Sequence, residues 1–297
     1  MTLEQLRIFV GVAEREHMTS AARAMNITQS AASAAISSLE ERHHVKLFHR
    51  VGRGIVLTEA GRDFLTEART VLARAASAQD VLEEFGGLKR GTLHVTASQT
   101  TTAYWLPQIL MVFKVRHPLI SVELTIGNTE QALARVRDGV ADIGIVEGET
   151  DDPAVAHWPI GEDRLLLVGA RSFRAAKLDA AWLRQARWIT REPGSGTAST
   201  LERRLRRLGV DPNTLNVVMR LPSNEAVRTA VEGSSCVAAL SQLVVGPSIS
   251  AGTLHAAPLD LGRRRFYGLR HKERYRSKAS DALLEIIKEG VAPAAPR

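Results

Sequence analysis

The sequence contains a single cysteine, Cys236, and lacks any long uninterrupted apolar run. One cysteine excludes a disulfide framework and a cysteine-rich metal site, and its apolar surroundings predict a buried, unreactive thiol. Gly, Ser or charged residues interrupt every apolar stretch before about 18 residues, so no membrane span is expected. Acidic residues in the first turns and the lack of a small-residue cleavage site predict no signal peptide. We therefore expect a cytoplasmic globular protein of two or three compact units.

The net charge of +7 is not concentrated in the N-terminal part of the chain. Residues 1–90 contain 12 Lys and Arg against 11 Asp and Glu, whereas residues 91–297 contain 27 against 21. A basic balance is typical of proteins with acidic partners. Here it does not indicate which part binds such a partner, so that inference has to come from motifs.

The N-terminal segment has the pattern of three helices. Thr2 and Gln5 have the spacing of a capping box in front of the first apolar repeat. Thr19 or Ser20 is expected to cap a second, short helix, and Asn26 suits the left-handed turn that follows it. The predicted helices cover residues 3–16, 21–25 and 29–42.

A pair of short strands is expected after the third helix. The apolar segments 45–48 and 55–57 flank the glycine-containing turn HRVGRG, which is typical of a hairpin. Arg50 and Arg53 lie at this turn, where they could contact phosphates or a narrow minor groove; solvated loop charges are the alternative. Short helix, tight turn, helix and hairpin together indicate a winged helix-turn-helix, with a plain helical hairpin as the alternative.

The segment AARAMNITQSAASAAISSLEERHHVKLFHRVGRGIVLTEAG resembles the winged helix-turn-helix of LysR-type transcriptional regulators. The resemblance extends loosely over the rest of the chain and implies that residues 1–58 bind double-stranded promoter DNA. Glutamine can pair bidentately with adenine, whereas Ala34 and Ala35 replace long polar residues and favour thymine-methyl contact and readout of DNA shape. The DNA-contacting residues implied by the resemblance are Thr28, Gln29, Ser30, Ser33, Arg50 and Arg53.

Residues 59–90 are expected to form a long linker helix and a hinge. About 28 residues without an internal Pro or Gly after Gly61 predict a helix of roughly 40 Å, and Gly86-Gly87 ends it. A helix this long exposes its apolar seam unless it self-associates or packs on its own C-terminal domain. The resemblance implies the first, giving a homodimer or homotetramer. The seam consists of Phe64, Val71, Ala75, Ala78, Leu82 and Phe85.

Residues 91–297 alternate strand and helix patterns in two successive units, which predicts an α/β fold with parallel strands. Two such lobes resemble the periplasmic-binding-protein-like effector domain of the same family. Its small-molecule effector would bind in the cleft between lobes, beyond the carboxyl ends of strands. The first lobe is expected to comprise about 91–161 and 268–297, and the second about 162–267.

Polar clusters lie where such a cleft requires hydrogen-bond donors. Hydroxyls and amides follow the predicted strands and open the next helices, although ordinary helix capping is the alternative for each. The predicted effector-binding residues are Ser98, Thr100, Thr101, Thr102, Asn128, Gly144, Ser195, Thr197, Ser223 and Asn224.

The segment 191–197, REPGSGT, joins a strand to a helix and could cradle an anion with its backbone amides. It lacks the GK[ST] of a nucleotide P-loop. The segment is similar to that of the regulators of sulfur assimilation and carbon fixation, which implies a small, anionic effector and RNA polymerase as a further partner.

No catalytic site, metal site or cofactor is predicted, because no His spacing suits a metal and no nucleophile–base set can be argued. The arginines at 203–207 and 263–265 are interpreted as mainly solvated. One alternative to a regulator is a solute-binding or enzymatic α/β domain with a helical cap. Another is an architectural DNA binder without an effector.

Overall fold

The chain forms two compact units, one built on Met1–Gly87 and the other on Leu88–Arg137 and Ala141–Arg297. Each unit is described by itself. Arg53, a predicted DNA contact, lies outside the described residues, as does the side chain of Phe85. The computed structural model describes residues 1–52, 54–85, 91–148, 150–173 and 178–290.

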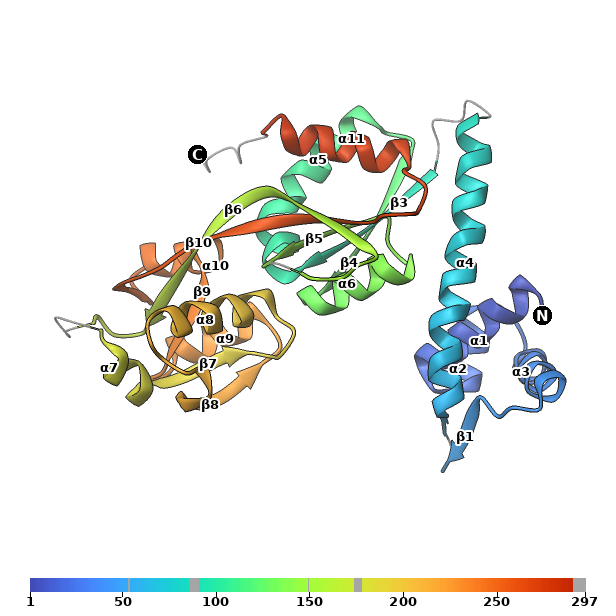
Figure 1. Ribbon diagram of the computed structural model, residues 1–297, viewed down its shortest axis with the longest axis horizontal. Helices are drawn as coiled ribbons and strands as arrows, with labels where there is room; N and C mark the ends of the chain where they lie inside the picture. Colours follow the sequence, from blue (N-terminus) through green and yellow to red (C-terminus); the bar gives the residue numbers. More distant parts are fainter. Residues whose placement is uncertain (53, 86–90, 149, 174–177, 291–297) are drawn as a thin grey trace. The chain divides into compact units, whose positions relative to one another are not determined.

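The N-terminal unit is three helices, a two-stranded antiparallel hairpin and a long helix (Figure 1). This order is that of the predicted winged helix-turn-helix followed by a linker helix. Its elements are α1 (Leu3–Arg15), α2 (Met18–Ala24), α3 (Gln29–His43), β1 (Phe48–Val51), β2 (Gly54–Leu57) and α4 (Glu59–Phe85).

Local capping determines where the first helices begin. The Thr2 hydroxyl accepts a hydrogen bond from the Gln5 amide at 3.1 Å and the Gln5 side chain accepts from the Thr2 amide at 3.0 Å, so the capping box is confirmed. Asn26 adopts the expected left-handed conformation, with φ of 54°. The expected cap of α2 was wrong: the His17 ring accepts from the Ser20 amide at 3.2 Å, so α2 begins at Met18. An imidazole nitrogen can accept this bond as a hydroxyl does.

An aromatic core holds the winged helix-turn-helix together. The fully buried Phe9 ring of α1 lies 5.6 Å from the Phe48 ring of β1 and 4.8 Å from the Phe64 ring of α4, centroid to centroid. Such tilted aromatic contacts add to the free energy gained by burying apolar area. Phe64, which is half-buried, therefore packs at least partly against the core of its own unit.

The remaining seam of α4 is largely exposed in the described residues. Val71 is 40% exposed and Leu82 is 73% exposed, while Ala78 is exposed and Ala75 half-buried. Large apolar side chains exposed along one long helix are typical of a surface that packs against a partner.

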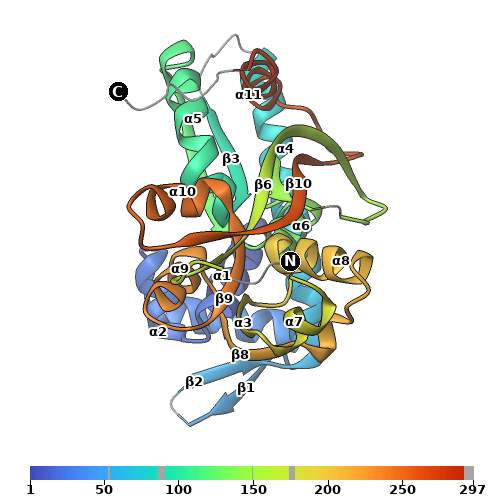
Figure 2. The same ribbon diagram turned by 90° about the vertical axis from the view of Figure 1, so that its left-hand side faces the viewer.

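The C-terminal unit is an α/β structure with two lobes (Figures 1 and 2). The first lobe contains β3 (Gly91–Ser98), η1 (Thr101–Trp105), α5 (Leu106–Arg116), β4 (Ile120–Gly127), α6 (Thr129–Asp138), β5 (Ile143–Glu147) and α11 (Lys278–Lys288). The second contains α7 (Ala180–Gln185), β7 (Arg187–Arg191), α8 (Gly196–Arg207), η2 (Pro212–Thr214), β8 (Asn216–Leu221), α9 (Asn224–Glu232), β9 (Val237–Ser241) and α10 (Gln242–Ser250).

Two long antiparallel strands, β6 (Val155–Gly169) and β10 (His255–His271), run through both lobes and join them. The strand order is β4-β3-β5-β10-β6-β9-β7-β8, in which β3 pairs in parallel with β4 and β5, and β7 pairs in parallel with β8 and β9. The expected lobe boundaries near residues 161 and 267 fall inside these two strands. A residue in the middle of β6 or β10 therefore belongs to the junction of the lobes.

Helices cover both faces of each lobe's sheet. In the first lobe, α5 and α11 pack on one face around Phe113 and Leu283, and α6 packs on the other around Val136. In the second lobe, α7 and α8 enclose one core around the fully buried Trp188, and α9 and α10 enclose another around Val231. The carboxyl ends of the parallel strands lie at the lobe junction, which is where such sheets usually bind ligands.

Candidate functional site

The start of α3 presents polar side chains to solvent. Thr28, Gln29 and Ser30 are exposed, while Ser33 is half-buried one turn later. The Thr28 hydroxyl accepts from the Ala31 amide at 3.1 Å and lies 3.0 Å from the Ser30 hydroxyl, so Thr28 caps the helix as predicted. The helix N-terminus and the side chain of Gln29 are thus open to a partner.

The two alanines that follow differ in their surroundings. Ala34 is exposed, whereas Ala35 is half-buried and packs against the core of the unit. Ala34 is therefore the more accessible of the two alanines. Ser37 and Ser38 are exposed farther along the helix and are not among the predicted contacts.

The wing is the hairpin of β1 and β2, in which Arg50 pairs with Ile55 and is exposed. Its position relative to α3 depends on the buried carboxylate of Glu40. That carboxylate accepts from the backbone amides of Leu47 at 2.8 Å and Phe48 at 3.3 Å, and from the Lys46 ammonium at 2.6 Å. Glu40 therefore ties the last turns of α3 to the first residues of the wing.

Burial raises the pKa of Glu40, but the hydrogen bonds from Lys46, Leu47 and Phe48 outweigh burial and leave the pKa below its ordinary value. A lowered folded-state pKa gives a stabilisation that is present above the pKa of the unfolded chain and lost as pH falls through the folded value. We expect Glu40→Ala to destabilise the N-terminal unit by about 2–3 kcal/mol at neutral pH, and Glu40→Gln to cost less.

The measurement is urea unfolding followed by far-UV circular dichroism at neutral and acidic pH. Wild type should lose stability toward the acidic end more steeply than Glu40→Gln, which has no carboxylate to protonate. An identical pH dependence for the two proteins would show that Glu40 does not contribute as an ion.

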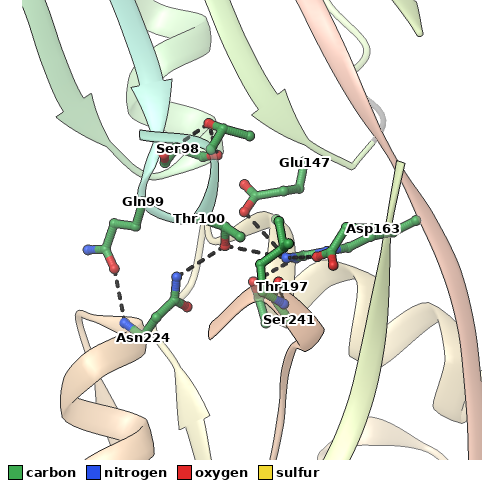
Figure 3. Close-up of polar contacts among 12 residues, drawn as sticks. Ser98, Gln99, Thr100, Glu147, Asp163, Thr197, Asn224 and Ser241 are labelled. Carbon is green, nitrogen blue, oxygen red and sulfur yellow. Dashed lines mark hydrogen bonds and ion pairs between the residues drawn. The ribbon is translucent and has the colours of Figure 1, made fainter. Parts of the chain in front are cut away.

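At the lobe junction, side chains from both lobes meet around the guanidinium of Arg264 (Figure 3). This side chain is 2% exposed and lies in the middle of β10. Its Nε and Nη2 donate to Asp163 Oδ2 on β6 at 2.9 and 2.8 Å, and its Nη1 donates to the Thr197 hydroxyl of α8 at 2.8 Å. Nη2 also lies 3.3 Å from the Thr100 hydroxyl and 3.6 Å from the carboxylate of Glu147.

The sequence interpretation of Arg264 as a solvated charge was wrong. Its neighbours Arg263 and Arg265 are exposed, because alternate residues of a strand point to opposite faces. The sequence of three consecutive arginines does not indicate which of them faces inward. The pairing of β6 with β10 sets Arg264 directly opposite Asp163, and this pairing could have identified Arg264 as the inward-facing residue.

A second buried cation lies nearby. Arg191, at the end of β7, forms a two-bond ion pair with Glu192 at 2.7 and 2.9 Å and donates to the Asn224 side chain. Asn224 in turn donates to the Thr100 hydroxyl at 3.1 Å, and its backbone amide donates to the Gln99 side chain at 3.0 Å. Direct hydrogen bonds therefore link the first lobe to the second.

The structure brings some of the predicted effector residues to this junction and gives others a structural role. Thr100, Thr197 and Asn224 contact one another through Arg264 or directly, as Figure 3 shows. Ser98 and Thr101 bond to each other at 2.9 Å, and the Thr101 hydroxyl lies 3.0 Å from the Ile145 carbonyl oxygen. These two residues hold the turn after β3 in place.

The other predicted residues lie at helix starts or in packed strands. Asn128 caps α6 and donates to Glu192 at 3.4 Å across the junction, and Ser223 caps α9 by accepting from the Ala226 amide. At Gly144 an added Cβ would lie 2.9 Å from the Val136 side chain, so packing accounts for this glycine. Thr102 has a buried hydroxyl without a hydrogen-bond partner among the described residues.

Helix capping differs between the junction and the rest of the described fold. At α8 the N-cap residue Ser195 is buried and its side chain makes no capping bond. The helix that contains η1 and α5 begins earlier, at Gln99, so η1 itself is not a helix start. The other described α-helices have a side chain in that role. η1 is a π-helical turn, a feature that is frequent at functional sites. A helix start without a side-chain cap, such as that of α8, can accept an anion.

Within the described residues no group of His, Cys, Asp or Glu is arranged to hold a metal ion. Among the described helices, none has the length and apolar character needed to span a bilayer. Cys236 is buried, as expected.

These features define a protein with a DNA-reading winged helix-turn-helix and a two-lobed α/β domain. Residues 3–62 match the family model "Bacterial regulatory helix-turn-helix protein, lysR family", and residues 86–292 match the model "LysR substrate binding domain". The chain belongs to the LysR family of DNA-binding transcriptional regulators, with an effector-binding domain. The predicted fold class is confirmed. Because the family consists of transcriptional regulators, the alternative of a solute-binding protein or an enzyme with a helical cap was wrong.

Two curated relatives illustrate the similarity. A "Probable RuBisCO transcriptional regulator" of Nostoc sp. is 31% identical over 294 residues, which cover 96% of this chain and 87% of the relative. YeiE of Escherichia coli strain K12, described as an uncharacterized HTH-type transcriptional regulator, is 31% identical over 297 residues, with 99% of each chain covered.

Solved structures show the same fold. CbnR, a LysR family transcriptional regulator, has a TM-score of 0.68 at 21% identity, with 98% of this chain and 100% of that chain covered. The regulatory domain of Synechocystis PCC6803 CcmR in complex with 2-PG has a TM-score of 0.61 at 24% identity, with 70% of this chain and 100% of that chain covered.

Proposed function

We propose that this protein regulates promoters by reading DNA with α3 and by responding to a small metabolite bound between its lobes. The observation that carries the DNA-reading part is the exposed start of α3, where Thr28, Gln29 and Ser30 stand free of the core. A helix N-terminus favours a phosphate, and the Gln29 amide can pair with adenine in the major groove. Ser33 lies on the same side of α3, and Arg50 and Arg53 of the wing would contact the DNA backbone.

The effector in this proposal carries an anionic group, which the uncapped start of α8 receives. Thr102 and Ser195 supply further polar groups, because the first has a buried hydroxyl without a partner and the second does not cap its own helix. CcmR, which shares the fold, was solved with 2-PG, and this supports a small-molecule site in such a domain.

Regulation requires the effector to bind two arrangements of the lobes with different affinity. β6 and β10 join the lobes, so closing the lobes on an effector would alter the assembly and the bend of the bound DNA. Self-association along α4, through the exposed Val71 and Leu82, would give a homodimer that reads a pseudo-palindromic site, with a homotetramer built from two dimers. RNA polymerase is the expected further partner.

Fluorescence anisotropy with the promoter DNA upstream of the protein's own gene tests the DNA-reading part. Gln29→Ala should lose roughly 5–150-fold of the preference for this DNA over a random duplex, because a bidentate base contact contributes about 1–3 kcal/mol of discrimination. Arg50→Ala should weaken binding to both DNAs and reduce the salt dependence, because a phosphate contact carries no sequence information.

The matched control is Gln108→Ala, which removes an exposed glutamine from α5 in the other unit. It should leave both affinities unchanged. If wild type shows no preference for the promoter at any salt concentration, or if Gln29→Ala retains the full preference, direct readout by α3 is refuted.

A further inference from the structure

The ion pair of Arg264 with Asp163 leaves one carboxylate oxygen unused. An arginine fork commonly binds both oxygens of a carboxylate with two parallel bonds. Here Nε and Nη2 both donate to Oδ2, at 2.9 and 2.8 Å. Asp163 Oδ1 is buried and has no hydrogen-bond partner within the described part of the chain. The Asp163 side chain is only 1% exposed.

A second buried acid, Glu147, lies near Arg264 Nη2. The Glu147 carboxylate is 3% exposed and lies 3.6 Å from Arg264 Nη2, beyond hydrogen-bonding distance. Figure 3 shows Glu147 and Asp163 approaching the same region from β5 and β6. Arg191, the other buried cation of the junction, is already paired with Glu192. Two acids therefore face one arginine, and the group formed by Arg264, Asp163 and Glu147 carries a formal charge of −1.

A buried, net negative group with an unused acceptor favours a positively charged donor nearby, because an uncompensated buried charge is costly. We infer that the effector carries a protonated amino group that binds Asp163 and Glu147, and that it is a zwitterion of the amino-acid type. This inference rests on the proposed function, which supplies the binding site and places the anionic group at the start of α8. The amino group would donate to Asp163 Oδ1 and to the Glu147 carboxylate.

The same charges disfavour a purely anionic ligand. A sulfate or a phosphate ester without an amino group would approach two carboxylates whose arginine, Arg264, is already occupied by Asp163, Thr197 and Thr100. In a zwitterion, the anionic group can lie at the start of α8 while the ammonium group lies at the acids. Each end then meets the charge that favours it.

Thermal unfolding of the full-length protein, followed by tryptophan fluorescence, tests this inference. All four tryptophans, Trp105, Trp158, Trp182 and Trp188, lie in the C-terminal unit, so the signal reports on the effector domain alone. The probes are the standard amino acids, the hydroxy acids that replace an amino group by a hydroxyl (lactate for alanine, glycerate for serine, malate for aspartate), sodium sulfate and 2-PG, at equal ionic strength. A ligand that binds the folded state raises Tm.

We expect at least one amino acid to raise Tm, and its hydroxy acid to bind at least tenfold more weakly. Glu147→Gln and Asp163→Asn should each weaken binding of that amino acid roughly 10–150-fold, the range for losing a charged hydrogen bond. Glu147→Gln is the safer variant, because Glu147 makes no hydrogen bond to Arg264. Asp260→Asn, which alters an exposed acid of β10 paired with Arg164, is the matched control and should leave binding unchanged.

The amino-group inference is overturned if sulfate, 2-PG or a hydroxy acid raises Tm as much as every amino acid, or if Glu147→Gln leaves amino-acid binding intact. In that case the proposed function still stands, provided that Thr197→Ala weakens the binding of the anion. If no probe of either kind changes Tm or DNA affinity, both the amino-group inference and the effector part of the proposed function fail.

Discussion

Replacing Arg264 by methionine is expected to lower the free energy of unfolding of the C-terminal unit by roughly 3–5 kcal/mol. Removing one partner of a buried ion pair leaves an uncompensated charge, and such changes typically cost this much. Here two carboxylates, Asp163 and Glu147, would be left buried without their cation. The hydroxyls of Thr100 and Thr197 would lose a donor as well. Arg264→Met should therefore lower Tm by about 10 °C in a unit of this size.

Tryptophan fluorescence during thermal and urea unfolding measures this effect. The matched control is Arg263→Met, because Arg263 is adjacent, 76% exposed at its side chain and paired with the exposed Glu162 at 2.6 Å. Surface pairs contribute little, so this variant should stay within about 1 kcal/mol of wild type. The double variant Arg264→Met with Asp163→Asn should recover part of the loss. Equal stability of Arg264→Met and wild type would show that the buried ion pair does not hold the lobe junction together.

Replacing Gly61 by alanine is expected to disrupt the N-terminal unit. An added Cβ would lie 2.2 Å from the Leu47 carbonyl oxygen and 2.9 Å from the Leu57 side chain. Thr58 stabilises the close packing of Gly61 against Leu47. Its hydroxyl donates to the Lys46 carbonyl at 2.8 Å and accepts from the Gly61 amide at 2.8 Å. Because the nearest atom is backbone, relief requires the start of α4 to move away from the wing. We expect a loss of about 3 kcal/mol, at the upper end for overpacking.

The expected result is loss of far-UV circular dichroism at a lower urea concentration together with loss of DNA binding. The tryptophan transition should not change, since no tryptophan lies in residues 1–90. Gly246→Ala in α10 is the matched control, because an added Cβ there meets nothing within 4 Å. It should be neutral or slightly stabilising. If Gly61→Ala binds DNA with wild-type affinity, the close approach of α4 to the wing is not required for function.

Local patterns in the chain were sufficient to predict most elements and their ends. The Thr2–Gln5 capping box, the left-handed Asn26 and the Thr28 cap were all expected, because each depends on atoms within a few residues. The alternation of strand and helix patterns predicted the α/β fold, because these patterns also depend on residues that are close together in the chain. Capping by a histidine ring at His17 was missed, since the preference for that residue at such a position is weak.

Pairings between distant segments could not be read from those local patterns. Three successive arginines look alike in a sequence, but the register of β10 with β6, residues some hundred positions apart, places Arg264 opposite Asp163 and turns Arg263 and Arg265 to solvent. The same distant packing directs Phe64 into the core around Phe9. Helix caps and periodicity depend on nearest neighbours along the chain, whereas the charge at the lobe junction depends on which strands meet. The chain's residue order thus established the family and the start of α3, and long-range strand pairing established which charges meet at the lobe junction.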